Sequence, residues 1–238
     1  MTDPNSWDAT GARTAGALYL AIAVCGGFSI GYLPTQIVGV DGATSAANLL
    51  ANTDLFRLGV LADSAVILFE LAITVILYQL FRATGPRMAM VALISRLGMI
   101  GVMGINLMLW VMPYSLLTTT TLDTATLHAL VQYSLDAHAM GVFVWQLFFG
   151  MHLLALGWLV LKSSKVPNLL GWGLFIGAFG YLVQGIVELT YTDVALLDAA
   201  IIGLLVIVSI AEISFGFWLL IRGGRTPSEI LTSTAAKA

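Results

Sequence analysis

Four ionisable residues lie near the middle of four long apolar segments of this chain: Glu70, Arg96, His152 and Glu212. A charged residue at the centre of a bilayer costs about 2.5–3.5 kcal/mol on insertion scales. A chain with several such groups either pairs them or uses them. A carboxylic acid in a dry pocket can protonate a hydrophobic substrate, and a histidine can relay a proton. Glu70, Glu212 and His152 are therefore candidate catalytic residues, and Arg96 is a candidate ligand-binding residue.

The same four residues also fit a structural role. A buried arginine can bind carboxylates through two parallel hydrogen bonds, and such an ion-pair network would fix the alignment of the helices. One arginine facing two carboxylates leaves one negative charge without a counter-ion. Either one glutamate stays protonated or His152 becomes cationic, and a group between two protonation states suits acid–base chemistry. The residue types leave both roles open.

The composition is that of a polytopic membrane protein. Of 238 residues, 59% are apolar and 10% are charged, and the mean hydropathy is +0.94. Soluble domains carry about 25% charged residues. No basic tail or charge block indicates nucleic acid. The single cysteine, Cys25, excludes an internal disulfide and a cysteine-rich metal site.

Six stretches have the roughly 20 apolar residues that a membrane-spanning helix needs. They are residues 13–36, 57–82, 87–112, 138–161, 168–190 and 197–221. The predicted fold is therefore all-α, a bundle of six transmembrane helices in one membrane domain, residues 13–223. A short cytoplasmic N-terminus, residues 1–12, and a cytoplasmic tail, residues 224–238, complete the organisation. Residues 124–136 carry leucines at helical spacing and either lie in the interface or extend the fourth span outward.

Basic residues predict the orientation of the spans. Eight fall on one side if the termini lie together: Arg13, Arg82, Arg87, Lys162, Lys165, Arg222, Arg225 and Lys237. Only Arg57 falls on the other side, where the loops carry Asp41, Asp54, Asp123 and Asp193. Basic residues prefer the cytoplasmic side. Both termini are therefore expected in the cytoplasm.

Depth counting places the ionisable residues in layers. At 1.5 Å per residue, Glu70, Arg96, His152 and Glu212 lie about 15–18 Å from the cytoplasmic ends of their spans, near the middle of a core of about 30 Å. Further outward lie a second set of candidate ligand-binding residues, at about 25 Å or more: Asp63, Asn106, His138, Gln146, Gln184 and Glu188. In the fifth span, glycines 173, 177 and 180 share a face with Gln184 and Glu188, which predicts close helix packing.

Cofactor and metal sites are not predicted. His138 and His152 are 14 residues apart on one helix, as in proteins that stack two haems. Haem binding would need a methionine ligand or a second subunit, because the remaining histidine, His128, lies outside or at the surface. No compact pair of ligands suits zinc. The expected partners are the lipid bilayer, a small hydrophobic ligand, and a second copy or another membrane protein.

Two stretches resemble a known family. They are F-R-L-G-V-L-A-D, from Phe56 to Asp63, and the segment from His138 to Gly171 that contains F-F-G-M-H-L-L-A-L-G. Both are similar to bacterial membrane proteins grouped as domain of unknown function 4386, and the likeness runs from about Arg13 to Gly223. It implies six helices and a bacterial inner membrane, and it implies no activity. Arg57, Asp63, His138 and His152 match the family pattern.

Three functions remain open at this point. The first is binding or transformation of a small or lipidic ligand above the Glu70, Arg96, His152 and Glu212 layer. The second is an accessory or scaffold subunit in which the buried charges are structural. The third is a small proton-coupled carrier, which requires a cavity that reaches both faces of the membrane.

Overall fold

The computed structural model describes residues 7–119, 121–192 and 195–223. The predicted cytoplasmic tail with Arg225 and Lys237 lies outside these residues, as do Asp193 and the first half of the predicted N-terminus. Every regular element in the described part is helical: α1 (Ala9–Gly26), the π-helix η1 (Gly27–Tyr32), α2 (Leu33–Ile37), α3 (Gly42–Ala51), α4 (Thr53–Phe81), α5 (Pro86–Thr119), α6 (Thr124–Lys162), α7 (Asn168–Leu189) and α8 (Ala195–Ile221).

Six helices are long and apolar enough to cross a membrane, which confirms the predicted fold class. The first is continuous from α1 through η1 to α2, and the others are α4 to α8. They form a closed ring in which each helix packs on two neighbours, in the order α1, α4, α5, α6, α7, α8 and back to α1. A ring of six helices leaves room for side chains and a cavity at its centre.

Glycines allow the closest helix contacts, as the sequence predicted for the fifth span. A Cβ atom on Gly177 of α7 would lie 2.5 Å from the Cβ of Val208 on α8, and one on Gly173 would lie 2.7 Å from the Cβ of Ala211. Gly16 of α1 faces the backbone of Leu220 in α8 in the same way. These contacts join α8 to both of its neighbours in the ring, α7 and α1.

The end of the bundle near the termini is packed with apolar side chains. Its core includes Leu77, Phe81, Leu156, Phe215 and Leu219. The Trp7 ring meets Phe81 edge-on at 5.8 Å, and its indole nitrogen donates a hydrogen bond of 2.7 Å to the carbonyl oxygen of Gly223. This end of the ring is therefore closed by packed side chains.

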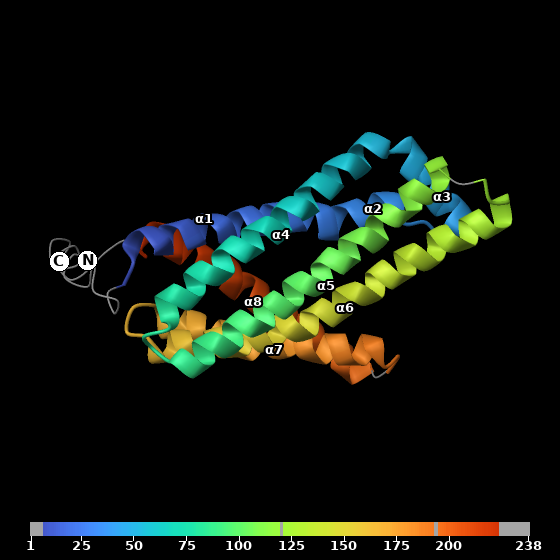
Figure 1. The fold of residues 1–238 in the computed structure, drawn as a ribbon. Coiled ribbons are helices and arrows are strands. Elements are labelled where there is room, and N and C mark those ends of the chain that lie inside the picture. Colours follow the sequence, from blue (N-terminus) through green and yellow to red (C-terminus); the bar gives the residue numbers. More distant parts are fainter. Residues whose placement is uncertain (1–6, 120, 193–194, 224–238) are drawn as a thin grey trace.

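The opposite end extends beyond a bilayer core. At 1.5 Å per residue, α5 and α6 are about 51 Å and 58 Å long, against about 30 Å of hydrocarbon. In Figure 1 they extend well past the ends of α7 and α8, and α3 packs beside their outer parts. A second apolar core, which includes Leu49, Phe56, Trp110 and Val131, holds this extension together. Residues 124–136 belong to α6, so they extend the fourth span.

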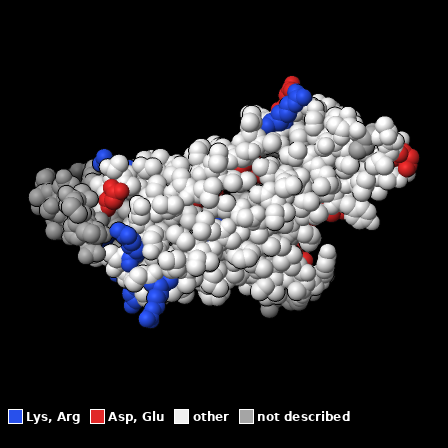
Figure 2. All heavy atoms as spheres, in the orientation of Figure 1, with Lys and Arg blue, Asp and Glu red and all other residues white. Residues whose placement is uncertain are grey.

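Exposed charges gather at the two ends. Figure 2 shows a broad band with few charged atoms between them, with most of the lysine and arginine atoms near the end that carries the termini. At the other end, Arg57 pairs with Asp54 at 3.2 Å and donates to the Tyr114 hydroxyl at 3.1 Å. A surface band with so few charges is what a bilayer covers.

Candidate functional site

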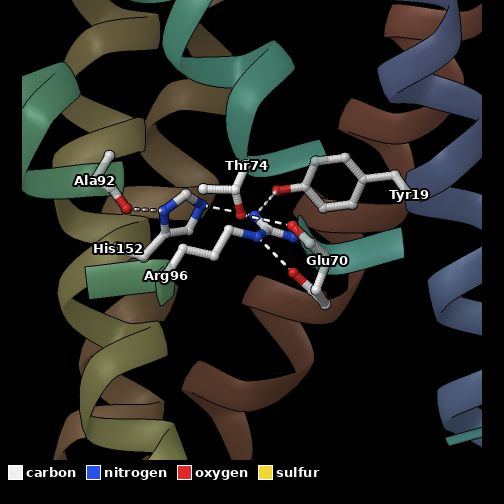
Figure 3. Close-up of polar contacts among 6 residues, drawn as sticks. All are labelled: Tyr19, Glu70, Thr74, Ala92, Arg96 and His152. Atoms are coloured by element: carbon white, nitrogen blue, oxygen red, sulfur yellow. Dashed lines mark hydrogen bonds and ion pairs between the residues drawn. The ribbon is translucent and has the colours of Figure 1, made fainter. Parts of the chain in front are cut away.

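A buried ion pair lies at the centre of the ring. Arg96 of α5 is 0% exposed and Glu70 of α4 is 4% exposed, and the arginine Nε donates to the glutamate Oε2 at 2.5 Å. Figure 3 shows the Arg96 side chain reaching from α5 between His152 and Glu70. The two residues are 26 positions apart in the sequence, and depth counting placed them in one layer. The structure thus joins two of the four midplane residues directly.

His152 of α6 is the third member of this network. Its Nε2 lies 2.7 Å from Arg96 Nη1, and its Nδ1 lies 2.8 Å from the carbonyl oxygen of Ala92. A guanidinium has only donors, so Nε2 must accept a hydrogen bond. Nδ1 then carries the proton and donates to Ala92. The geometry therefore requires a neutral imidazole with both nitrogens occupied, and of the two open charge states it disfavours a cationic His152.

Aromatic rings enclose the guanidinium. Its central carbon lies 5.3 Å from the ring centre of Tyr19 and 5.6 Å from that of Phe149, and Nη1 donates to the Tyr19 hydroxyl at 3.3 Å. His152 stacks on Phe149 with an interplanar angle of 8°. One nitrogen, Nη2, is buried and has no hydrogen-bond partner in the described part of the chain. A buried donor of this kind is unfavourable unless something accepts from it.

Glu212 of α8, the fourth midplane residue, has a different partner. It forms no ion pair within the described residues, and its Oε2 accepts a hydrogen bond of 3.3 Å from the hydroxyl of Tyr181 on α7. The second carboxylate is therefore separate from the Arg96–Glu70 pair. It is the ionisable group of this layer with the fewest protein contacts.

All six spanning helices contribute to one central cavity of about 500 Å³. Glu70, Arg96 and Glu212 line it together with the aromatic residues Tyr19, Trp145, Phe149 and Tyr181. Most of the remaining lining is apolar, from side chains such as Val66, Met99, Met103 and Ile213. Ligand sites are commonly apolar cavities of about 300–1,000 Å³ with a few polar groups that fix orientation. This cavity has that character.

The π-helix η1 forms one edge of the cavity. Short π-helical segments occur frequently at functional sites. Gly27 and Gly31 lie in η1, line the cavity and are exposed, and a Cβ atom on either would have no neighbour within 4 Å. Ala23 of α1 and Ser209 and Ile213 of α8 also line the cavity and are exposed. These five residues, Ala23, Gly27, Gly31, Ser209 and Ile213, define a lateral mouth between α1–η1 and α8.

The mouth lies at membrane depth. Ala23 follows Arg13 by ten residues, and Ile213 precedes Arg222 by nine, so both lie about 14–15 Å from the basic end of the bundle. Ser209 and Gly31 lie further along, at about 20 Å and 27 Å. A hydrocarbon core of about 30 Å therefore covers the opening. An opening at this depth would face the lipid chains, and Glu70, Arg96 and Glu212 line the same cavity.

The second predicted layer is only partly assembled. Asp63, Asn106 and His138 line a water-sized pocket of about 10 Å³, which shares Ile30, Met103 and Trp145 with the main cavity. His138 Nδ1 lies 3.1 Å from the carbonyl oxygen of Asn106. Asp63 is 8% exposed, and the buried Oδ1 of Asn106 has no partner among the described residues. This cluster joins the cavity on the side away from the termini.

The other predicted ligand-binding residues lie elsewhere. Gln146 is buried but does not line the main cavity, and its Oε1 has no partner in the described part. Gln184 is half-buried and Glu188 is exposed, and neither lines the cavity. The glycine face of α7 packs on α8, but it does not carry its polar end into the centre. Among the described residues, no three His, Cys, Asp or Glu side chains are grouped so as to hold a metal.

Sequence reasoning missed Tyr19 and Tyr181, which hydrogen-bond to the midplane residues. Depth counting over readily ionised residues and amides leaves tyrosines out. Tyr181 is 14 residues beyond Pro167, which places it about 20 Å deep. A tyrosine at that depth needs a partner for its hydroxyl. The depth of Tyr181 was therefore the sequence signal that its hydroxyl has a partner within the bundle.

The fold and the cavity define a class: a polytopic membrane protein with six spanning helices and buried ionisable residues around an internal cavity. The chain belongs to the family described as Domain of unknown function (DUF4386), which matches residues 14–223. An uncharacterized protein of Archaeoglobus fulgidus is 34% identical over 87 residues, which are 37% of this chain and 48% of that protein. The match thus spans about half the length of this relative. No solved structure matches the chain.

Proposed function

We propose that this protein binds a small amphipathic or lipidic ligand in the central cavity. The observation that carries the proposal is the composition of the cavity wall. It combines about 500 Å³ of mostly apolar space with a buried arginine nitrogen that has no partner in the described residues and with the loosely held carboxylate of Glu212. The polar end of a ligand would lie beside Arg96 and Glu212. Its apolar part would extend toward the lateral mouth.

Entry from the bilayer follows from the position of the mouth. Gly27 and Gly31 leave open space where side chains would otherwise close the gap between η1 and α8. The end near the termini is filled by the apolar core around Leu77, Phe81 and Phe215. A lipid-soluble ligand therefore has a route into the cavity through the mouth.

If the ligand is also transformed, Glu212 is the residue that we assign to proton transfer. Glu70 is held by Arg96 at 2.5 Å, and both nitrogens of His152 are engaged. Glu212 lines the cavity and has a neighbouring hydroxyl, that of Tyr181, at 3.3 Å. Arg96 would bind the ligand, with Glu70 and His152 as the residues that position its guanidinium. In this proposal Asp63, Asn106 and His138 extend the polar lining outward.

We also propose that both termini are cytoplasmic and that the protein resides in a bacterial plasma membrane as one six-helix domain. The support is the gathering of basic residues at the end that carries the termini. A C-terminal fluorescent-protein fusion should fluoresce, and an alkaline phosphatase fusion at the same position should be inactive. The reverse pattern would invert the assignment.

The rival functions have weaker support. A carrier needs access from both faces, and packed side chains close the end near the termini. A scaffold role does not account for a cavity that includes an arginine nitrogen with no partner in the described residues. Ligand binding accounts for both features.

Native mass spectrometry of two matched variants tests the proposal. Gly27→Leu places a side chain in the mouth, while Gly101→Leu makes the same change on an exposed glycine of α5 that does not line the cavity. A Cβ atom at either position has no neighbour within 4 Å. The wild type and Gly101→Leu should retain a lipid-sized adduct, and Gly27→Leu should lose it. Equal adducts in all three proteins, or none in the wild type, would contradict ligand binding in the cavity.

A further inference from the structure

We infer the chemical class of the ligand: a neutral lipid whose headgroup is an aromatic or conjugated ring that bears oxygen acceptors, as in the quinones. This inference rests on the proposed function and adds the identity of the headgroup. Three observations carry it: the balance of charge in the cavity, the available donor, and the aromatic wall.

The charge balance favours a neutral headgroup. Arg96 and Glu70 form a contact ion pair, so together they contribute no net charge. Glu212 adds either a negative charge or none. An anionic headgroup would therefore leave at least one uncompensated negative charge in a site with little water, and such burial is costly. A carboxylate or phosphate lipid is disfavoured in either protonation state of Glu212.

The free donor requires an acceptor. Arg96 uses Nε for Glu70 and Nη1 for Tyr19 and His152. Nη2 has no acceptor among the described residues, although Arg96 lines the cavity. A ring carbonyl or hydroxyl oxygen would accept from it. Hydrogen bonds from a charged donor are about twice as strong as neutral ones, so this single contact can orient the headgroup.

The aromatic wall favours a flat ring. Trp145, Phe149 and Tyr181 form a mutual cluster with ring centres 6.0 Å, 5.2 Å and 6.5 Å apart, and all three line the cavity. Tyr19 lines it from α1. Aromatic faces pack well on planar rings. They also attract cations, but an ammonium headgroup has only donors and cannot accept a hydrogen bond from Arg96 Nη2.

The tail of such a lipid has a defined route. Gly27, Gly31 and Ile213 at the mouth are exposed and apolar, so a chain passing between η1 and α8 would reach the hydrocarbon directly. The ring would lie at the aromatic cluster and the tail in the bilayer.

Quenching of tryptophan fluorescence by decylubiquinone tests the inference, because Trp145 lines the cavity. Wild-type protein and Gly101→Leu in detergent should show saturable quenching. Trp145→Phe should lose the saturable component, and Gly27→Leu should weaken binding at least about tenfold. A quinone analogue that absorbs little light should displace decylubiquinone. Oleate and dodecylamine, added at the same mole fraction, should displace it at least about tenfold more weakly, because each carries a charge.

The outcomes separate the two proposals. If oleate or dodecylamine displaces decylubiquinone equally well, or if decylubiquinone fails to bind while the native adduct is still lost in Gly27→Leu, the quinone class is wrong and ligand binding stands. If quenching is identical in Gly27→Leu, Trp145→Phe and wild type and no variant alters the native adduct, both proposals fail.

Discussion

Two conservative substitutions should show by their melting temperatures that the carboxylate of Glu70 is structural and that of Glu212 is not. Glu70→Gln leaves the fully buried Arg96 without its counter-ion. Breaking a buried pair by removing one partner costs about 3–5 kcal/mol. For a chain of this size, each kcal/mol lowers the melting temperature by about 2–4 °C, so a loss of about 6–20 °C is expected.

Glu212→Gln should be nearly silent by comparison. It breaks no ion pair in the described part of the chain, and the amide oxygen can still accept from the Tyr181 hydroxyl. The expected loss is under about 1 kcal/mol, or under about 4 °C.

The single cysteine provides the assay. Cys25 is half-buried in α1, and unfolding exposes its thiol to a fluorogenic dye. Melting curves of the wild type and the two variants are compared in one detergent. An equal loss in both variants would refute the reasoning, because Glu212 would then be as structural as Glu70.

Three further predictions concern the network, the packing and the helix caps. The nitrogen chemical shifts of His152 at neutral pH should be those of a neutral imidazole protonated at Nδ1; a cationic signal would contradict the hydrogen-bond assignment. Gly177→Leu should abolish folding or cost several kcal/mol, since its Cβ would lie 2.5 Å from that of Val208, whereas Gly101→Leu should fold normally; equal melting temperatures would count against the α7–α8 contact. At the start of α3, the hydrogen bond from the Thr44 backbone lowers the pKa of Asp41 from its ordinary 3.8, so this cap stabilises the protein above that value and is lost as the pH falls below it. The difference in melting temperature between wild type and Asp41→Asn should therefore be larger at pH 7 than at pH 3, and a difference that grows on acidification would contradict it.

The sequence predicted the fold well because a bilayer constrains it strongly. Backbone groups in hydrocarbon must be bonded internally, so apolar stretches of the right length become helices. The fourth span illustrates the limit: composition placed its start near His138, whereas α6 begins at Thr124. Residues 124–136 pack on α3 and the second apolar core, whereas their helical spacing alone left open whether they extend the span or lie in the interface.

The sequence predicted how deep the residues of the candidate site lie in the membrane, but not which residues their side chains contact. Counting along each helix placed Glu70, Arg96, His152 and Glu212 in one layer, and three of them are hydrogen-bonded to one another. Which helices are neighbours decides the rest. Because α7 lies beside α8, Glu212 meets Tyr181 and makes no ion pair with Arg96 in the described residues. The lateral mouth depends on how η1 runs relative to α8. The periodicity of apolar residues along each helix does not specify that arrangement.

The most direct test of ligand binding is an experimental density map of the protein purified from its membrane with no ligand added. We expect elongated density that begins beside Arg96 and Glu212, crosses the aromatic cluster, and leaves the bundle between Gly27 and Ile213. A map in which α1 packs against α8 along its whole length, with no space between them, would contradict it.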